Sequence, residues 1–193
     1  EARCRLGSLL REMGQFAEAR ALIEPALAAD ESADGQPSPA LLRDWNALGQ
    51  LLQDEGNPDE ALPVLRRAWE AAEQILPPGQ PLRAAVATNL ASVLRDLGLA
   101  DQAVIVHRLA LQEDEDHRGA GHPSVGREAI DLAVTLLAVG DPTGAQALAE
   151  RALALDEACF GGQHPAVGRD LANLAEIMRA RGNLDASEAA TRR

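Results

Sequence analysis

The chain has 193 residues and a formal net charge of −12 at pH 7, which argues against nucleic acid or an anionic membrane as its partner. Hydrophobic residues make up 46% of it but aromatic residues only 2%, so the apolar material is mostly Ala and Leu, which favour helices over strands. No stretch approaches the roughly 18 apolar residues of a membrane span. Because we find no secretory signal, we expect a cytoplasmic location. All basic residues are Arg, which together with abundant Ala and Gly indicates a GC-rich bacterial genome.

The chain repeats one segment several times. Five glycines are spaced 42 residues apart, at Gly14, Gly56, Gly98, Gly140 and Gly182. Leu stands eight residues before each of them, at Leu6, Leu48, Leu90, Leu132 and Leu174. A small residue stands five residues after each of them, at Ala19, Ala61, Ala103, Ala145 and Ser187. This fixed spacing predicts a stack of structural repeats.

Each repeat is predicted to be an antiparallel pair of helices. A proline opens the first helix, where its missing N–H costs nothing, and Leu at intervals of three or four gives that helix one apolar stripe. The recurring glycine ends the helix, because Gly adopts the left-handed conformation without strain. Asn57-Pro58 and Asp141-Pro142 are then predicted as N-cap and first residue of a second helix. One pair cannot bury its own stripe, so neighbouring pairs must stack.

In chain order, the predicted repeat units cover residues 1–38, 39–80, 81–122, 123–164 and 165–193, as one array over residues 1–193. The first unit lacks an opening proline and starts inside its first helix. The later units open on Pro39, Pro81, Pro123 and Pro165, and the last stops partway along its second helix. We therefore expect the chain to be a piece of a longer protein.

The second unit resembles a tetratricopeptide repeat. In "WNALGQLL…EGNPDEALPVLRRAWEAA", five residues stand at that family's places, namely Trp45, Leu48, Gly49, Ala61 and Ala68. The period of 42 residues and the linkers "GAGHP" and "GGQHP" are similar to the variant in kinesin light chains and many bacterial regulators. The resemblance implies an all-α fold, a right-handed α-solenoid of five helix-turn-helix units. The other units lack the large aromatic residue of Trp45, with Ala87, Ala129 and Leu171 in its place.

Two histidines recur and invite a catalytic interpretation. His122 and His164 are 42 residues apart, each before a helix-opening proline, and Ser38 and Gln80 occupy the same position in other units. A position that accepts Ser and Gln favours helix capping over proton transfer. His107 occupies a position that is otherwise apolar, so we expect it to be partly buried with its polar atoms satisfied.

Neither metal chemistry nor catalysis is indicated. The acids of "QEDEDHRGAGH", residues 112–122, are contiguous and lack the spacing of a metal loop, so we expect a solvated helix end. Cys4 and Cys159 form no redox motif, and we expect them to be small buried residues. We find no serine elbow, phosphate loop or zincin motif. The sequence predicts no enzyme, no cofactor and no metal site.

The family resemblance implies that the first helices line a concave groove where a ligand binds. Seven residues are our candidates for that groove, namely Arg43, Asn89, Arg95, Arg127, Arg169, Asn173 and Arg179. An Asn amide both donates to and accepts from a peptide backbone, and Arg offers forked donors to carboxylates. Arg169 with Asn173 resembles half of the carboxylate clamp of chaperone-binding relatives, but Asp131 and Ala47 depart from that pattern, so the specificity is not carried over.

The sequence thus predicts a scaffold that binds an extended, acidic peptide segment of a partner protein, with no nucleic acid and no membrane involved. Three alternatives remain open. The arginines could serve only to solubilise the exposed helix face. The chain could be the regulatory or sensor arm of a larger signalling protein, with a kinase or ATPase domain elsewhere. It could also self-associate through the ends of the solenoid.

Overall fold

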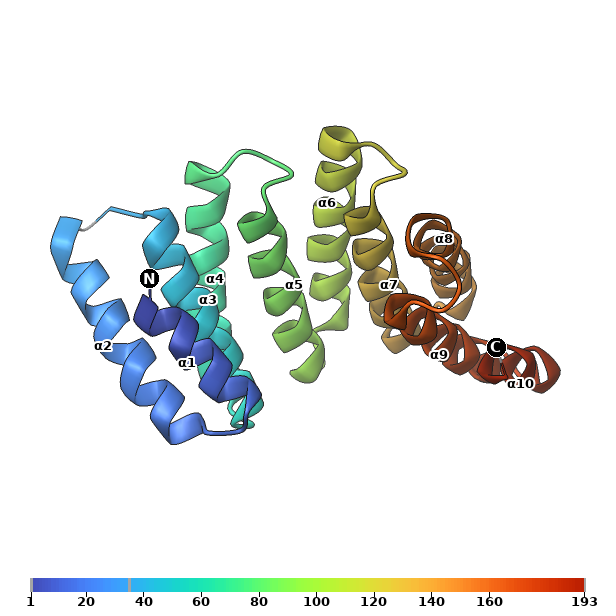
Figure 1. Ribbon diagram of the computed structural model, residues 1–193, viewed down its shortest axis with the longest axis horizontal. Coiled ribbons are helices and arrows are strands. Elements are labelled where there is room, and N and C mark those ends of the chain that lie inside the picture. The colour runs from blue at the N-terminus through green and yellow to red at the C-terminus, as the bar shows by residue number, and fades with distance from the viewer. Residues whose placement is uncertain (1, 35, 193) are drawn as a thin grey trace. The chain divides into compact units, whose positions relative to one another are not determined.

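The computed structural model describes residues 2–34 and 36–192, apart from the side chains at positions 2, 4, 33 and 34, so Cys4 lies outside what is described. These residues form ten helices and no strand, which confirms the all-α prediction (Figure 1). The helices are α1 (Ala2–Glu12), α2 (Phe16–Asp34), α3 (Pro39–Asp54), α4 (Pro58–Ile75), α5 (Pro81–Asp96), α6 (Ala100–Arg118), α7 (Pro123–Ala138), α8 (Pro142–Phe160), α9 (Pro165–Ala180) and α10 (Leu184–Thr191). They make five pairs, in which the odd-numbered helix comes first.

The helix ends follow the local signals of the sequence. The glycine after each first helix has a positive φ, between 72° and 83° (Gly14, Gly56, Gly98, Gly140 and Gly182). Prolines occupy the first turn of α3, α4, α5, α7, α8 and α9, as predicted. Asp141 caps α8 by accepting from the Gly144 N–H at 2.9 Å. Asn57 precedes α4 but makes no side-chain cap, so that detail of the prediction is wrong.

The two helices of a pair approach closely at small residues. A Cβ added to Gly49 in α3 would lie only 2.4 Å from Cγ of Leu65 in α4. A Cβ on Gly7 in α1 would lie 2.7 Å from Cγ1 of Ile23 in α2. The alanines at the start of the second helices are fully buried (Ala19, Ala61, Ala103 and Ala145). Backbone proximity within a pair therefore depends on glycine or alanine at these positions.

The chain divides into two compact units, an N-terminal unit of residues Glu1–Gly98 and a C-terminal unit of residues Leu99–Arg193. In the N-terminal unit, α3 contacts both α1 and α5, whereas contacts between the second helices α2 and α4 are not found in the described part. In the C-terminal unit α7 likewise contacts α9. The first helices therefore form a continuous inner layer within each unit, and the second helices form the outer layer.

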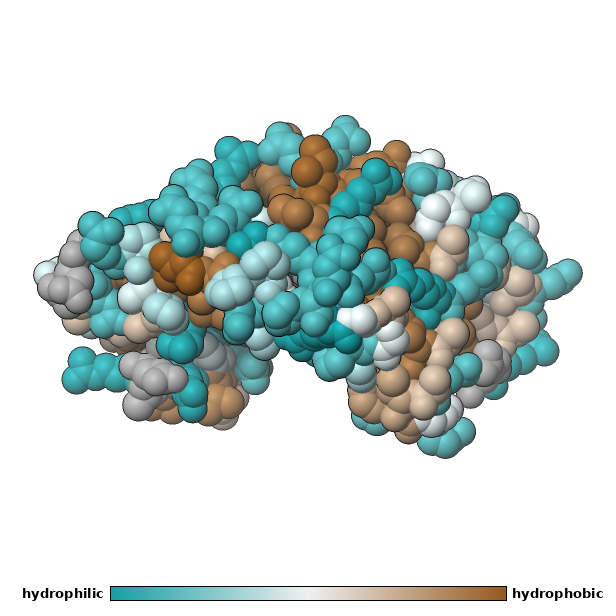
Figure 2. Space-filling view, turned by 90° about the horizontal axis from the view of Figure 1, so that it is seen from above, coloured by the Kyte–Doolittle hydropathy of each residue, from teal (hydrophilic) through white to brown (hydrophobic). Residues whose placement is uncertain are grey.

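Each unit has its own apolar core. In the N-terminal unit, one cluster centres on Trp45 and Leu42, and another joins Ile23 to Leu51. In the C-terminal unit, one cluster runs from α6 to α10. On the face shown in Figure 2, hydrophilic residues cover most of both units and hydrophobic residues reach the surface in separate patches. None of the helices, over the described residues, is long and apolar enough to cross a membrane.

Candidate functional site

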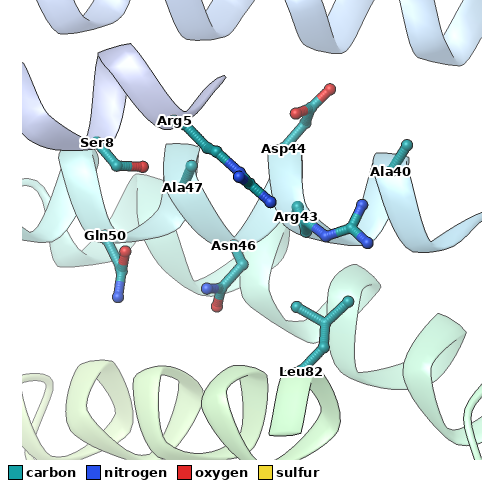
Figure 3. Close-up of a pocket in the computed structure, with 9 residues that line it drawn as sticks. All are labelled: Arg5, Ser8, Ala40, Arg43, Asp44, Asn46, Ala47, Gln50 and Leu82. Carbon is teal, nitrogen blue, oxygen red and sulfur yellow. The ribbon is translucent and has the colours of Figure 1, made fainter. Parts of the chain in front are cut away.

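A depression lies on the inner layer of the N-terminal unit, between α1, α3 and α5, with a volume of about 180 Å³ (Figure 3). The exposed surface of the depression is mostly apolar, although most of the side chains that line it carry a polar group. In Figure 3, Arg5 extends from α1 across α3, and Leu82 of α5 points into the depression from the opposite side. The lining residues are Arg5, Ser8, Ala40, Arg43, Asp44, Asn46, Ala47, Gln50 and Leu82.

The charges of this depression are partly engaged within the protein. Arg43, one of the predicted groove residues, is exposed and lines it, together with the exposed Arg5. Both arginines take part in interactions inside the protein, as does the buried Asp44. Two guanidinium groups beside one carboxylate leave this site with an excess of positive charge, although the whole chain is strongly acidic.

The predicted groove residue Asn89 is half-buried on α5 and donates from Nδ2 to Oδ1 of Asn46 on α3, at 2.8 Å. A side-chain amide has two donor hydrogens and an acceptor oxygen, so this bond uses only part of what the two amides offer. Asn46 is not among the predicted groove residues, because its position holds unrelated residue types in the other repeats. The spacing of 43 residues between Asn46 and Asn89, one repeat plus one residue, was the available signal.

Arg95 is half-buried at the end of α5, where its Nη2 lies 3.4 Å from the Ser92 hydroxyl oxygen. The same hydroxyl accepts from Nε2 of Gln53 on α3 at 2.8 Å. At the equivalent position of the first repeat, Arg11 donates to Asp54 of α3 at 2.5 Å. In this row Arg11 and Gln53 link neighbouring first helices, whereas the bond of Arg95 stays within α5, and a ligand would compete with these bonds.

The other four candidates belong to the C-terminal unit and differ in availability. Arg127 on α7 is exposed, and it makes no hydrogen bond or ion pair with any described residue. Asn173 on α9 is half-buried. Arg179 is exposed near the end of α9 and lines a separate depression between α9 and α10. Only Arg127 thus presents an unengaged guanidinium on the inner layer away from the end of this unit.

Arg169, the remaining candidate, forms ion pairs with two buried carboxylates. Its Nη2 lies 3.6 Å from Oδ2 of Asp156 on α8 and 3.3 Å from Oδ1 of the neighbouring Asp170. Burial raises the pKa of Asp170 to about 6; the Arg169 cation opposes this effect and the nearby Asp156 carboxylate adds to it. Because an isolated buried carboxylate is costly, the charge of Arg169 is committed inside the protein.

The two recurring histidines cap helices. His122 Nδ1 accepts the backbone N–H of Ser124, and His164 Nδ1 accepts that of Ala166, each at 3.2 Å. Both bonds satisfy N–H groups in the first turn that have no partner within the helix. The structural interpretation of these residues is therefore confirmed. The ring of His164 also stacks on Phe160 at a centroid distance of 4.5 Å.

Ser124, His122 and Asp114 form a cluster whose order is unsuited to nucleophilic catalysis. The Ser124 hydroxyl donates to the Asp114 carboxylate, and its oxygen lies 2.7 Å from His122 Nδ1. A Ser-His-Asp triad needs the imidazole between the hydroxyl and the carboxylate, whereas here the hydroxyl stands between them. Asp114 is only 2% exposed and pairs with Arg118, so the expectation that all acids of residues 112–122 are solvated is wrong.

The other candidate groups are two isolated residues, His107 and Cys159, and the possible metal ligands. His107 takes part in an interaction inside the protein, but it is only 1% exposed, more deeply buried than expected, and its Nδ1 makes no hydrogen bond with the described residues, so the expectation that all its polar atoms are satisfied is wrong. Cys159 is a free thiol but exposed, so the expectation of burial is wrong for it. No set of three or more His, Cys, Asp or Glu side chains within residues 2–34 and 36–192 is placed to hold a metal ion.

The geometry defines the class of protein, a chain of helix hairpins in which the first helices form the inner layer of each unit. The family model of the tetratricopeptide repeat matches residues 1–74, 82–158 and 127–193. The chain belongs to the tetratricopeptide repeat family. A comparison with curated protein sequences finds no match.

Solved structures share the fold. The chain is similar to BtubC (BKLC) from P. vanneervenii, with 23% identity, a TM-score of 0.82, and coverage of 97% of this chain and 74% of that one. A putative kinesin light chain of Podospora anserina with nearly identical repeats is 22% identical, with a TM-score of 0.84 over 99% of this chain and 90% of that one. A Rap protein complexed with competence and sporulation factor is 14% identical, with a TM-score of 0.76 over 97% of this chain but only 50% of that one. At these identities the likeness shows the fold alone.

Proposed function

We propose that this chain is a protein-binding scaffold whose inner layer holds an extended, acidic segment of a partner protein. The observation that carries the proposal is the depression between α1, α3 and α5. There the guanidinium groups of Arg5 and Arg43 lie beside the side-chain amides of Asn46 and Gln50. The tetratricopeptide fold, which is consistent with protein–protein interaction, supports this assignment.

The chemistry of these groups fits an extended peptide. Amide side chains such as Asn46 and Gln50 pair with the backbone N–H and C=O of a strand without reading its side chains. Arginines add carboxylate recognition. Each exposed ion pair contributes only about 0.2–1 kcal/mol, so measurable affinity requires several contacts at once. Binding should weaken with added salt, since charges in solution are screened over about 8 Å at 0.15 M.

The seven predicted residues contribute unequally in this proposal. Arg43 and Arg127 are exposed and central to it, and Arg179 contributes at the end of the C-terminal unit. Asn89, Arg95 and Asn173 are half-buried and act mainly as hydrogen-bonding groups at the base of the groove. Arg169 contributes least, because it neutralises Asp156 and Asp170. The proposal retains the predicted cytoplasmic location.

The test uses a fluorescein-labelled peptide of alternating Glu and Ser as an extended acidic probe, with fluorescence anisotropy as the readout. The double variant Arg43→Glu, Arg127→Glu should bind about tenfold more weakly than the wild type, a change of about 1.4 kcal/mol. The matched control is Arg66→Glu, Arg108→Glu, which reverses two exposed arginines on the second helices α4 and α6. It should bind like the wild type. Equal losses in the two double variants, or no binding of the acidic probe by the wild type, would refute the proposal.

A recognition role inside a larger signalling protein is the second candidate. The Rap protein of similar fold is about twice as long as the matched region, since the match covers 50% of it. If this chain is likewise part of a larger signalling protein, its groove would bind the peptide that regulates that signalling protein. The reading frame that surrounds residues 1–193 decides between a self-standing scaffold and such an arm.

A further inference from the structure

Two carboxyl groups are buried together where α8 meets α9. Asp156 of α8 is 2% exposed and Asp170 of α9 is 0% exposed. The two carboxyls are close enough to hydrogen-bond, and the charge of Asp156 acts on Asp170. Asp156 Oδ1 and Asp170 Oδ2 are buried and accept no hydrogen bond from the described residues. Because buried carboxylates without donors are costly, this acid pair needs a cation or a proton.

The preceding repeat buries an equivalent pair of acids and supplies it with its own donors. Asp114 and Glu128 stand 42 residues before the two acids of the α8–α9 pair and are 2% and 5% exposed. Arg118 pairs with Asp114 at 2.9 Å, and the Ser124 hydroxyl donates to the same carboxylate. This earlier pair therefore receives a cation and a hydroxyl from residues close to it in the chain.

Both of these donors are missing at the α8–α9 pair. Phe160 and Ala166 occupy the positions of the arginine and the serine, and neither side chain has a donor. Arg169 takes their place: its Nη2 lies 3.6 Å from Asp156 Oδ2 and 3.3 Å from Asp170 Oδ1, and its Nε lies 3.4 Å from the same Oδ1. All three distances exceed those of ordinary hydrogen bonds. The acid pair therefore holds Arg169 through long contacts that another anion can replace.

Arg127 of α7 shows the alternative state of this position. It stands 42 residues before Arg169, is likewise exposed, and makes no hydrogen bond or ion pair with the described residues. The acids beside it are neutralised by other groups, so its guanidinium remains on the inner layer. Arg169 would be equally available there if the acid pair no longer held it.

A proton on the acid pair weakens its hold on Arg169. Burial raises the pKa of Asp170 to about 6, with the Asp156 carboxylate adding to this effect and Arg169 opposing it. Below that pH the pair has one negative charge fewer, and the protonated carboxyl is itself a donor for its neighbour. From α7, the residue that faces the pair is Gly126, whose added Cβ would lie 3.0 Å from Asp156 Oδ1. The charged residues of α10 are exposed (Asp185 and Glu188).

We propose that Asp156 and Asp170 form a pH-dependent gate for Arg169. While both carboxyls are ionised they hold the guanidinium, and when the pair takes up a proton they release it to an acidic segment on the inner layer. This regulation rests on the binding proposed above and adds that such binding strengthens in mildly acidic solution. Because coupling between two binding events is reciprocal, the bound segment also favours protonation of the pair.

The first test needs no ligand. The Nε–H resonance of Arg169, assigned by its loss in Arg169→Lys, is followed by NMR in a pH titration of the whole chain. In the wild type it should shift with a midpoint at about pH 6. In Asp170→Asn it should keep the low-pH position throughout, because the amide cannot ionise. A wild-type resonance that does not move overturns the gate.

The second test measures binding by fluorescence anisotropy. The probe is a peptide of alternating cysteic acid and Ser with a tetramethylrhodamine label, whose charge stays constant between about pH 5.5 and about pH 7.5. At the higher pH, Asp170→Asn should bind about threefold more tightly than the wild type, the contribution of one exposed ion pair. At the lower pH the two should bind equally. Histidines also change charge in this range, but the Asn variant retains them, so their effect cancels in the comparison.

A matched variant frees Arg169 without changing the acids. Phe160→Arg with Ala166→Ser copies Arg118 and Ser124 of the preceding repeat, so it should bind tightly at both pH values. Adding Arg169→Gln to this variant, or to Asp170→Asn, should abolish the gain. Circular dichroism verifies that each variant is folded.

The outcomes separate the gate from the proposed binding. Equal pH dependence in the wild type and in Asp170→Asn overturns the gate and leaves the binding in place. A gain that persists in the absence of Arg169 also overturns the gate, because another group must then carry it. Absence of binding by every variant at both pH values overturns the proposed function itself, and the gate with it.

Discussion

The contact between Gly49 and Leu65 yields a prediction whose sign is set by two opposing effects. Replacing Gly by Ala inside a helix normally stabilises it by about 0.5–1 kcal/mol. In α3, however, the new Cβ would lie 2.4 Å from Leu65 Cγ and 2.6 Å from its Cδ2. Leu65 is 0% exposed and has no room to move. Overpacking of this kind costs about 1–3 kcal/mol, so Gly49→Ala should destabilise the protein by about 1–2 kcal/mol.

A matched control lies in α9. A Cβ added to Gly168 would meet no atom within 4 Å, so Gly168→Ala should show only the helix-propensity gain of about 0.5–1 kcal/mol. Thermal unfolding followed by circular dichroism reports both changes. For a chain of this size 1 kcal/mol corresponds to roughly 2–4 °C in Tm. The two variants should therefore shift Tm in opposite directions.

The fourth repeat indicates one way in which the clash is relieved. Where Ala133 of α7 replaces the glycine, the residue at the position of Leu65 is Ala149, and both alanines are 0% exposed. In a Leu65→Ala background, Gly49→Ala should therefore no longer destabilise. A double-mutant cycle on residues 49 and 65 should give a coupling free energy of about 1–3 kcal/mol, the size of the overpacking cost. Additive effects, or a rise in Tm for Gly49→Ala alone, would refute the size compensation.

Three further predictions concern caps and a buried carboxyl. Asp141→Ala should cost about 1 kcal/mol in thermal melts, because it removes the acceptor of the Gly144 N–H, and Asp141→Asn should restore most of it. His122→Gln should cost less than Gly49→Ala in the same melts, since Gln80 occupies the equivalent position; a larger loss would show that the imidazole cap is essential. Because burial raises the pKa of Asp170 from 3.8 to about 6, the folded protein holds a proton that the unfolded chain has lost, so this contribution to stability is full below pH 4 and declines as pH rises towards 6. Urea unfolding should show that decline, and Asp170→Asn should remove it; an unchanged slope in the variant would assign the pH dependence to other groups.

The sequence by itself determined the fold, because its signals are local and recur. A glycine every 42 residues needs only its own positive φ to end a helix, and a proline needs only its missing N–H to be accepted in a first turn. The same pattern predicts a helix pair in each of the five repeats, so the positions of the helices within a repeat are supported five times. The caps of His122 and His164 followed in the same way, since each bonds an N–H two residues away.

The tertiary structure alone decided which polar side chains remain available. Arg127 and Arg169 occupy the same position of successive repeats, yet only Arg169 faces two buried carboxylates, one of them from another helix. Asn46 gained its partner Asn89 from the next first helix. The availability of a charge or an amide depends on burial and on groups that arrive from elsewhere in the chain. Periodicity along the sequence specifies the face of a helix but does not specify these neighbours.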